Sequence, residues 1–214
     1  MNIIYCYDAY CGWCYGFSPV IKRIEEKYRS KFTFEVLSGG MILPKQPTPI
    51  SVTAPYIQQA YKTVEEHTGI KFGEDYLWHI FNYEQSDWFP SSEKPAIAMC
   101  ILKDHDPGQA IAFAADLQHA LHFEGRDLTD DEAYRHLLPA YGLDAESFYE
   151  DLHSEVYKEK AYHEFAMVQQ LKVKGFPCVF LQITSGKFYQ LANGFISFDV
   201  LDERMQQVWQ EMQN

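Results

Sequence analysis

The feature that most constrains the fold of this chain is a pair of cysteines, Cys11 and Cys14, placed between a strand-like and a helix-like segment. Residues 2–8, ahead of the pair, are apolar and aromatic, which is typical of a buried strand. Residues 18–28, behind it, carry apolar side chains at helical spacing. Residues 32–37 then alternate and are rich in β-branched and aromatic side chains, which predicts a second strand. Strand, helix and strand in quick succession predict a βαβ unit with parallel strands and a right-handed crossover.

Strand signals return near the end of the sequence. Residues 178–184 predict a strand, Gly186 a tight turn, and residues 187–191 a strand that pairs back as a hairpin. Ser197 is expected to cap a closing helix that runs through Met212.

The intervening sequence predicts helices. Three prolines between residues 44 and 49 mark a linker. Asp106 and Pro107 have the residue types of a helix cap and a first-turn proline. A capping box at residues 129–132 precedes a helix predicted over residues 134–141. Further helix starts are expected at Ser92, Asp144 and Ser154.

The order of these elements predicts an α/β protein with a thioredoxin fold, in which βαβ and ββα units are separated by a large all-helical insertion. Residues 1–43 and 154–214 would form the thioredoxin-like domain, and residues 50–153 the insertion. The two halves of the thioredoxin-like domain must then meet in one sheet.

The cysteine pair has a specific chemical use at the start of a helix. Cys11 would lie where unpaired backbone N–H groups and the helix dipole favour a thiolate, the species that attacks disulfides. Cys14, one turn later, lies close enough to resolve a mixed disulfide. The two residues between them set the relative stability of the reduced pair, and Trp13 is expected to cover a sulfur or offer an apolar surface to a substrate.

The pair could instead bind zinc, but the sequence lacks the other ligands. A structural zinc site needs four ligands, usually from a second C-x-x-C or a pair of closely spaced histidines, and the eight histidines here are scattered. No metal site is therefore predicted. Five cysteines, an odd number, also do not form a disulfide framework. We expect Cys6, Cys100 and Cys178 to be buried core residues.

The net charge of the chain limits the classes of partner that it is expected to bind. A net charge of −12 argues against a nucleic-acid surface and against docking on anionic lipid, because both need concentrated Lys and Arg. No signal peptide and no stretch of about 20 apolar residues is visible. We therefore expect a cytoplasmic protein with no membrane partner.

Two further positions are candidates for the site. Pro177 opens a predicted strand, and X-Pro bonds tolerate the cis form, which would leave the backbone of Phe176 free to pair with a substrate. An ordinary trans proline is the alternative. Asp8, three residues before Cys11, is a candidate proton relay to Cys14 if burial raises its pKa, and a turn aspartate otherwise.

The thiol pair after a short strand, the helical insertion and the segment from Val173 to Pro177 together resemble the DsbA-like thioredoxin family, and more closely its leaderless branch of FrnE-like, predicted protein-disulfide isomerases. The resemblance covers essentially the whole chain. It implies that Cys11 is the nucleophile, Cys14 the resolving thiol and Pro177 a cis-proline, with Phe176 supplying substrate-facing backbone. The Gly-Trp dipeptide departs from the Pro-His of the periplasmic oxidant, so strong oxidising power is not implied.

We therefore predict a thiol-disulfide oxidoreductase of the disulfide isomerase type, acting on thiol- or disulfide-containing proteins or peptides. No metal or organic cofactor is required, and glutathione or a thioredoxin-like protein would be the redox partner. One alternative is a glutathione-dependent transferase or isomerase of the kappa-class type, although an intact thiol pair argues against it. The other is a non-catalytic client-binding protein. Whether the reaction runs as oxidation, reduction or isomerisation stays open.

Overall fold

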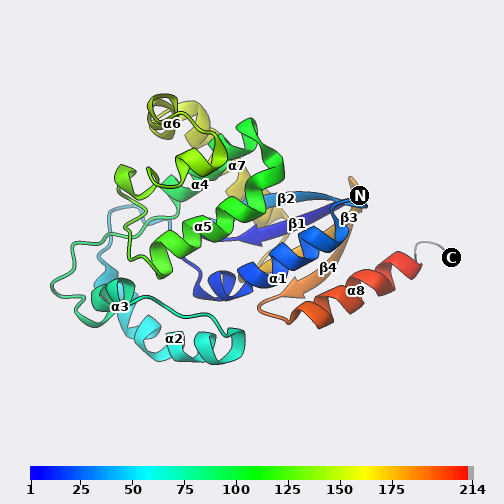
Figure 1. Ribbon diagram of the computed structural model, residues 1–214, viewed down its shortest axis with the longest axis horizontal. Helices are drawn as coiled ribbons and strands as arrows, with labels where there is room; N and C mark the ends of the chain where they lie inside the picture. Colours follow the sequence, from blue (N-terminus) through cyan, green and yellow to red (C-terminus); the bar gives the residue numbers. More distant parts are fainter. Residues whose placement is uncertain (212–214) are drawn as a thin grey trace.

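A four-stranded sheet forms the centre of the molecule. The computed structural model describes residues 1–211, and the predicted end of the last helix at Met212 lies outside them. The strands are β1 (Asn2–Tyr7), β2 (Thr33–Ser38), β3 (Cys178–Thr184) and β4 (Lys187–Asn193). Their order is β2-β1-β3-β4, with β1 and β2 parallel and the other neighbours antiparallel (Figure 1). The predicted parallel pair and the predicted hairpin are both confirmed.

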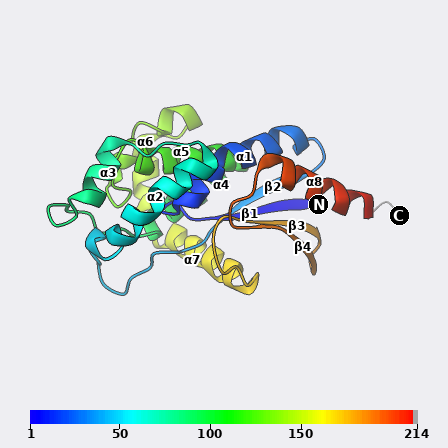
Figure 2. The ribbon, with the colours of Figure 1, turned by 90° about the horizontal axis from the view of Figure 1, so that it is seen from below.

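Helices cover both faces of this sheet. On one face lie α1 (Gly12–Tyr28) and α8 (Phe198–Glu211), and on the other lies α7 (Glu155–Gln170) (Figure 2). Alternation along β1 explains both layers, because successive side chains of a strand point to opposite faces. Ile3, Tyr5 and Tyr7 belong to the large core with α1 and α8, whereas Ile4 and Cys6 belong to a smaller core with α7.

The remaining helices follow β2 and precede α7 in the sequence, and they form a helical block. They are α2 (Ala54–Thr68), α3 (Glu74–Phe81), α4 (Glu93–His105), α5 (Ala110–His122) and α6 (Ala145–Leu152), with short 3-10 segments between some of them. Helices α2 and α3 lie beyond the end of the sheet toward which β1 runs (Figure 1). No helix in the described part of the chain is long and apolar enough to cross a bilayer.

The prediction of a helix over residues 134–141 is wrong. The chain there forms two 3-10 segments, Asp131–Ala133 and Leu138–Tyr141, and residues 129–132 do not cap an α-helix. The cause is Pro139, which lies inside the predicted helix. Proline has no N–H to donate and its ring clashes with the preceding turn, which disfavours an α-helix here, although the longer helix α1 accommodates Pro19.

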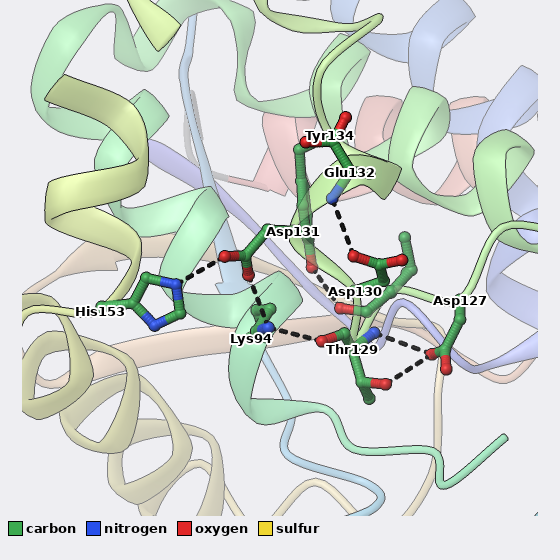
Figure 3. A network of polar contacts seen from close by, with 9 residues as sticks. Lys94, Asp127, Thr129, Asp130, Asp131, Glu132, Tyr134 and His153 are labelled. Atoms are coloured by element: carbon green, nitrogen blue, oxygen red, sulfur yellow. Dashed lines mark hydrogen bonds and ion pairs between the residues drawn. The ribbon is translucent and has the colours of Figure 1, made fainter. Parts of the chain in front are cut away.

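A polar network ties this 3-10 region to the helices around it. Lys94 of α4 donates to one carboxylate oxygen of Asp131 at 2.7 Å, and Nε2 of His153, after α6, lies 2.7 Å from the other (Figure 3). Lys94 also donates to the carbonyl oxygen of Thr129. Burial alone would raise the pKa of Asp131, but the hydrogen bonds from Lys94 and His153 outweigh it and hold that pKa below its ordinary value.

Replacing Asp131 by asparagine is expected to lower stability at neutral pH and not in strong acid. The stabilisation from a carboxyl with a lowered folded-state pKa is complete above its unfolded value, about 3.9, and is lost as the pH falls through the folded-state value. Because the network is partly exposed, the loss should be about 1 kcal/mol or less. Urea unfolding of wild type and Asp131→Asn at about pH 6 and about pH 2.5 tests this, and a gap of equal size at both pH values would contradict it.

A buried ion pair closes the outer edge of β2. Lys103 of α4 pairs with Glu164 of α7, and their side chains are 19% and 7% exposed. Lys103 Nζ also donates to the carbonyl oxygen of Val36 at 2.9 Å, while Glu164 accepts from the backbone N–H of Ser38 at 2.9 Å. The two side chains thus satisfy backbone groups that an edge strand would otherwise leave unpaired.

Candidate active site

Cys11 is the N-cap residue of α1. Its backbone is extended, with φ −83° and ψ 107°, and its Sγ accepts a hydrogen bond from the backbone N–H of Cys14 at 3.3 Å. The helix therefore begins directly after the first cysteine, as the sequence predicts. A sulfur in this position faces unpaired N–H groups and the positive end of the helix dipole, both of which stabilise a thiolate.

Cys14 lies beneath Cys11 in the first turn of α1. It is 0% exposed, whereas Cys11 borders a cavity, so the two thiols differ in access. Burial, together with the neighbouring Cys11, raises the pKa of the Cys14 thiol. Both cysteines are present as free thiols. The arrangement suits an outer thiol that meets a partner first and an inner thiol that reacts through it.

The loop before β3 lies against Cys11. The peptide bond between Phe176 and Pro177 is cis. The sequence alone did not decide between the cis and trans isomers. Cys11 Sγ lies 3.6 Å from the carbonyl oxygen of Phe176, as a donor to that oxygen. The loop is held by a hydrogen bond from the N–H of Gly194 to the carbonyl oxygen of Pro177 at 2.8 Å. Residues 165 positions apart thus meet at one sulfur.

Asp8 is buried behind the thiol pair. Its carboxylate accepts hydrogen bonds from the N–H groups of Tyr10 at 3.0 Å and Met41 at 2.7 Å, and from the hydroxyl of Ser92 at 2.9 Å. Burial raises the pKa of Asp8, and these donors act in the opposite direction. The side chain thus joins the end of β1 to two other segments. The proton relay to Cys14 stays a prediction.

A cavity of about 490 Å³ opens beside Cys11. Its walls are mainly apolar and aromatic, and they include Trp13, Ile42, Tyr56, Tyr61, Phe72 and Trp88. Lys174, on the loop before Phe176, is the charged residue among the described residues that line it. Trp13 lies between the ring of His67 in α2 and that of Phe195, with ring centroids 5.9 and 6.1 Å away. It is therefore part of the wall.

The other three cysteines lie away from this cavity. Cys6 and Cys178 face each other across β1 and β3, in the core beneath α7. Cys100 of α4 is 3.3 Å from the carboxylate of Glu164. All three are buried, which confirms the prediction that they are core residues. Within residues 1–211, no group of His, Cys, Asp and Glu side chains is arranged to hold a metal ion.

Several buried polar side chains near the site received no role from the sequence, and His122 and Tyr5 are two of them. His122 is enclosed by the rings of Tyr15, Phe72 and Tyr76, and burial lowers its pKa to about 3, so the ring is neutral near pH 7. The second is Tyr5, whose hydroxyl is buried without a hydrogen-bond partner among the described residues. His122 is one of the buried residues of α5 and Tyr5 lies in a strand that is apolar throughout, and no motif distinguishes them from ordinary core residues.

The chain is similar to a known protein family and to several solved structures. The family model of the DSBA-like thioredoxin domain matches residues 2–206. Among solved structures, a candidate protein disulfide isomerase from Nitrosomonas europaea superposes with a TM-score of 0.81 at 21% identity, covering 98% of both chains. The cytosolic disulfide reductase DsbM from Pseudomonas aeruginosa gives 0.75 at 24% identity and 100% of both chains, and it has also been solved with glutathione. At these identities the structures show a shared fold.

A curated relative matches over part of its length. The ClpXP adapter protein SpxH of Bacillus subtilis (strain 168) is 21% identical over 148 residues, which is 69% of this chain and 47% of SpxH. The chain therefore spans about half the length of that relative.

Proposed function

The chain belongs to the DSBA-like thioredoxin domain family, and from this premise we propose that it is a thiol-disulfide oxidoreductase that works through Cys11 and Cys14. The observation that carries the proposal is the position of the Cys11 sulfur. It caps α1, accepts a hydrogen bond from the N–H of Cys14 and borders an apolar cavity. These three properties suit a sulfur that attacks a bound disulfide as a thiolate.

The exchange proceeds in two displacements. In the reductive direction, the Cys11 thiolate attacks one sulfur of a substrate disulfide, the substrate S–S bond breaks, and the other substrate sulfur leaves as a thiolate. Cys14 then loses its proton and attacks Cys11, which forms the Cys11–Cys14 disulfide and releases the second substrate thiol. The reverse sequence oxidises a substrate dithiol. The backbone of Phe176, next to Cys11, would hold the substrate chain in place.

The lining of the cavity indicates which class of substrate it would bind. Its aromatic and aliphatic walls favour a protein or peptide whose cystine is flanked by apolar side chains, since such side chains gain free energy on leaving water. Trp13 would contact these side chains. Lys174, at the loop, would pair with a carboxylate of the substrate or of glutathione.

Glutathione or a thioredoxin-like protein is the proposed redox partner, and no metal or organic cofactor is required. Support comes from DsbM, a cytosolic protein of the same fold that has been solved with glutathione. For the same reason we propose that this chain acts in the cytoplasm, where thiols are kept reduced.

Replacing Cys14 by serine tests the proposal. The variant should form a stable one-to-one mixed disulfide between Cys11 and a peptide containing one cystine, because no second thiol resolves it, and turnover should stop. Intact-mass spectrometry before and after a reductant measures the adduct. Undiminished turnover would support a glutathione-dependent transferase or isomerase instead. The absence of any adduct on Cys11 would leave a client-binding protein.

A substitution at Gly39, which lies against the Phe176 ring, can displace Phe176. A Cβ added at Gly39 would lie 2.0 Å from Cζ of the Phe176 ring, so the ring must move. Because the carbonyl oxygen of Phe176 faces Cys11, Gly39→Ala should lower kcat/KM for a peptide disulfide by about tenfold, or about 1.4 kcal/mol.

Gly186→Ala is the matched control for this change. A Cβ at Gly186, in the turn between β3 and β4, meets no atom within 4 Å. Its kcat/KM should stay within about twofold of wild type. Equal kcat/KM for the two alanine variants would contradict a role of the Phe176 position in substrate binding.

A further inference from the structure

The hydroxyl of Tyr5 is a buried polar group without a hydrogen-bond partner among the described residues. Tyr5 lies in the middle of β1 and is 1% exposed, and its hydroxyl oxygen makes no hydrogen bond of ordinary geometry in the described part of the chain. Leaving a buried hydroxyl unpaired costs free energy, and native proteins pair nearly all such groups. A tyrosine at this position leaves its hydroxyl unpaired, whereas phenylalanine would bury no polar group there.

The surroundings of this hydroxyl point to a sulfur. Tyr5 belongs to the large core that also contains Cys14, and its ring packs 5.8 Å from the ring of Phe17, one turn beyond Cys14 in α1. Burial raises the pKa of this hydroxyl most, and the neighbouring Cys14 and Cys11 of α1 and Tyr7 of β1 raise it further.

We propose that the Tyr5 phenol is a catalytic residue of the exchange, which donates a hydrogen bond to the Cys14 sulfur as that sulfur becomes a thiolate. The inference rests on the proposed function. It assigns to the resolving thiol a side-chain donor, in addition to the backbone hydrogen bond at Asp8 that lowers the pKa of Cys14.

The resolving step explains why a donor is needed there. In that step the Cys14 thiol loses its proton, its sulfur attacks Cys11, the bond between Cys11 and the substrate sulfur breaks, and the substrate thiolate leaves and takes up a proton. Cys14 is 0% exposed, so water cannot solvate the transient negative charge. Burial raises the pKa of Tyr5 well above its ordinary value, so the phenol keeps its proton and can donate it in a hydrogen bond to the thiolate.

Asp8 is a poorer candidate for the same task. A carboxylate accepts hydrogen bonds, and its negative charge would oppose a thiolate on Cys14. Its oxygens already accept from Tyr10, Met41 and Ser92. Substitution of Asp8 and substitution of Tyr5 are therefore expected to have different effects on the stability of the Cys14 thiolate.

Tyr5→Phe removes the hydroxyl and keeps the ring. Because the hydroxyl makes no hydrogen bond of ordinary geometry, the variant should melt within a few degrees of wild type. Single-turnover reaction with a fluorescent peptide disulfide separates the release of the first substrate thiol from the release of the second. The first rate should be unchanged, whereas the second should fall by about tenfold or more, with its pH midpoint moved upward.

Tyr149→Phe is the matched control, because the Tyr149 hydroxyl in α6 is also buried without a partner and lies in the helical block. Both of its rates should equal those of wild type. A Tyr5→Phe variant whose second rate and pH midpoint match wild type would overturn the inference and leave the proposed function standing. A wild-type protein that releases no substrate thiol at all would overturn both.

Discussion

Replacing Cys11 by serine is expected to lower the disulfide exchange rate by roughly a thousandfold or more while leaving the fold intact. Serine cannot form a disulfide, so neither displacement can take place. The fold should survive because serine is a favoured N-cap residue, and its hydroxyl oxygen can accept the hydrogen bond that the Cys14 N–H now gives to Cys11. Reduction of a fluorescent peptide disulfide measures the rate, and thermal unfolding measures stability.

Cys100→Ser is the control for this loss. Cys100 is buried in α4 with its sulfur 3.3 Å from the carboxylate of Glu164, and a serine hydroxyl can donate to the same oxygen. That variant should retain full exchange activity. Residual activity above about a tenth of wild type in Cys11→Ser would mean that another thiol carries the reaction.

The largest expected effect on stability comes from Lys103. Replacing it by methionine leaves the carboxylate of Glu164 buried without its cation, and removing one partner of a buried pair typically costs about 3–5 kcal/mol. The backbone carbonyl of Val36 would lose its donor at the same time. Urea unfolding of wild type and Lys103→Met measures the difference.

The double variant Lys103→Met/Glu164→Leu should recover a large part of that loss, because no charge then stays buried. The N–H of Ser38 would still lack its acceptor, so recovery should be incomplete. A loss below about 1 kcal/mol in Lys103→Met would show that the pair behaves as an exposed one. The edge strand β2 leads directly to Gly39, so this pair also supports the segment under Phe176.

Local sequence patterns predicted the elements that carry the thiol pair. Apolar residues before Cys11 and helical spacing after it located β1 and α1, and the bounds of β3 agree with the predicted 178–184. The helix predicted over residues 134–141 failed because a favourable capping pattern was followed by Pro139, whose missing N–H prevails over propensity.

The walls of the site could not be predicted in the same way. They depend on contacts between residues far apart in the chain, such as the hydrogen bond from Ser92 to Asp8 and that from Cys11 to the carbonyl oxygen of Phe176. No local pattern records such contacts. Tyr5 was missed for the same reason, because its pattern is that of a core residue and only the fold brings it into one core with Cys14.

Cys11 and Cys14 are expected to form a working dithiol-disulfide couple. Equilibration with glutathione buffers of graded potential, followed by tryptophan fluorescence and by thiol trapping, measures it most directly, since Trp13 lies between the two cysteines. We expect a reversible two-electron transition that disappears in Cys14→Ser. Failure of the wild-type pair to form a disulfide, even in fully oxidised glutathione, would contradict it.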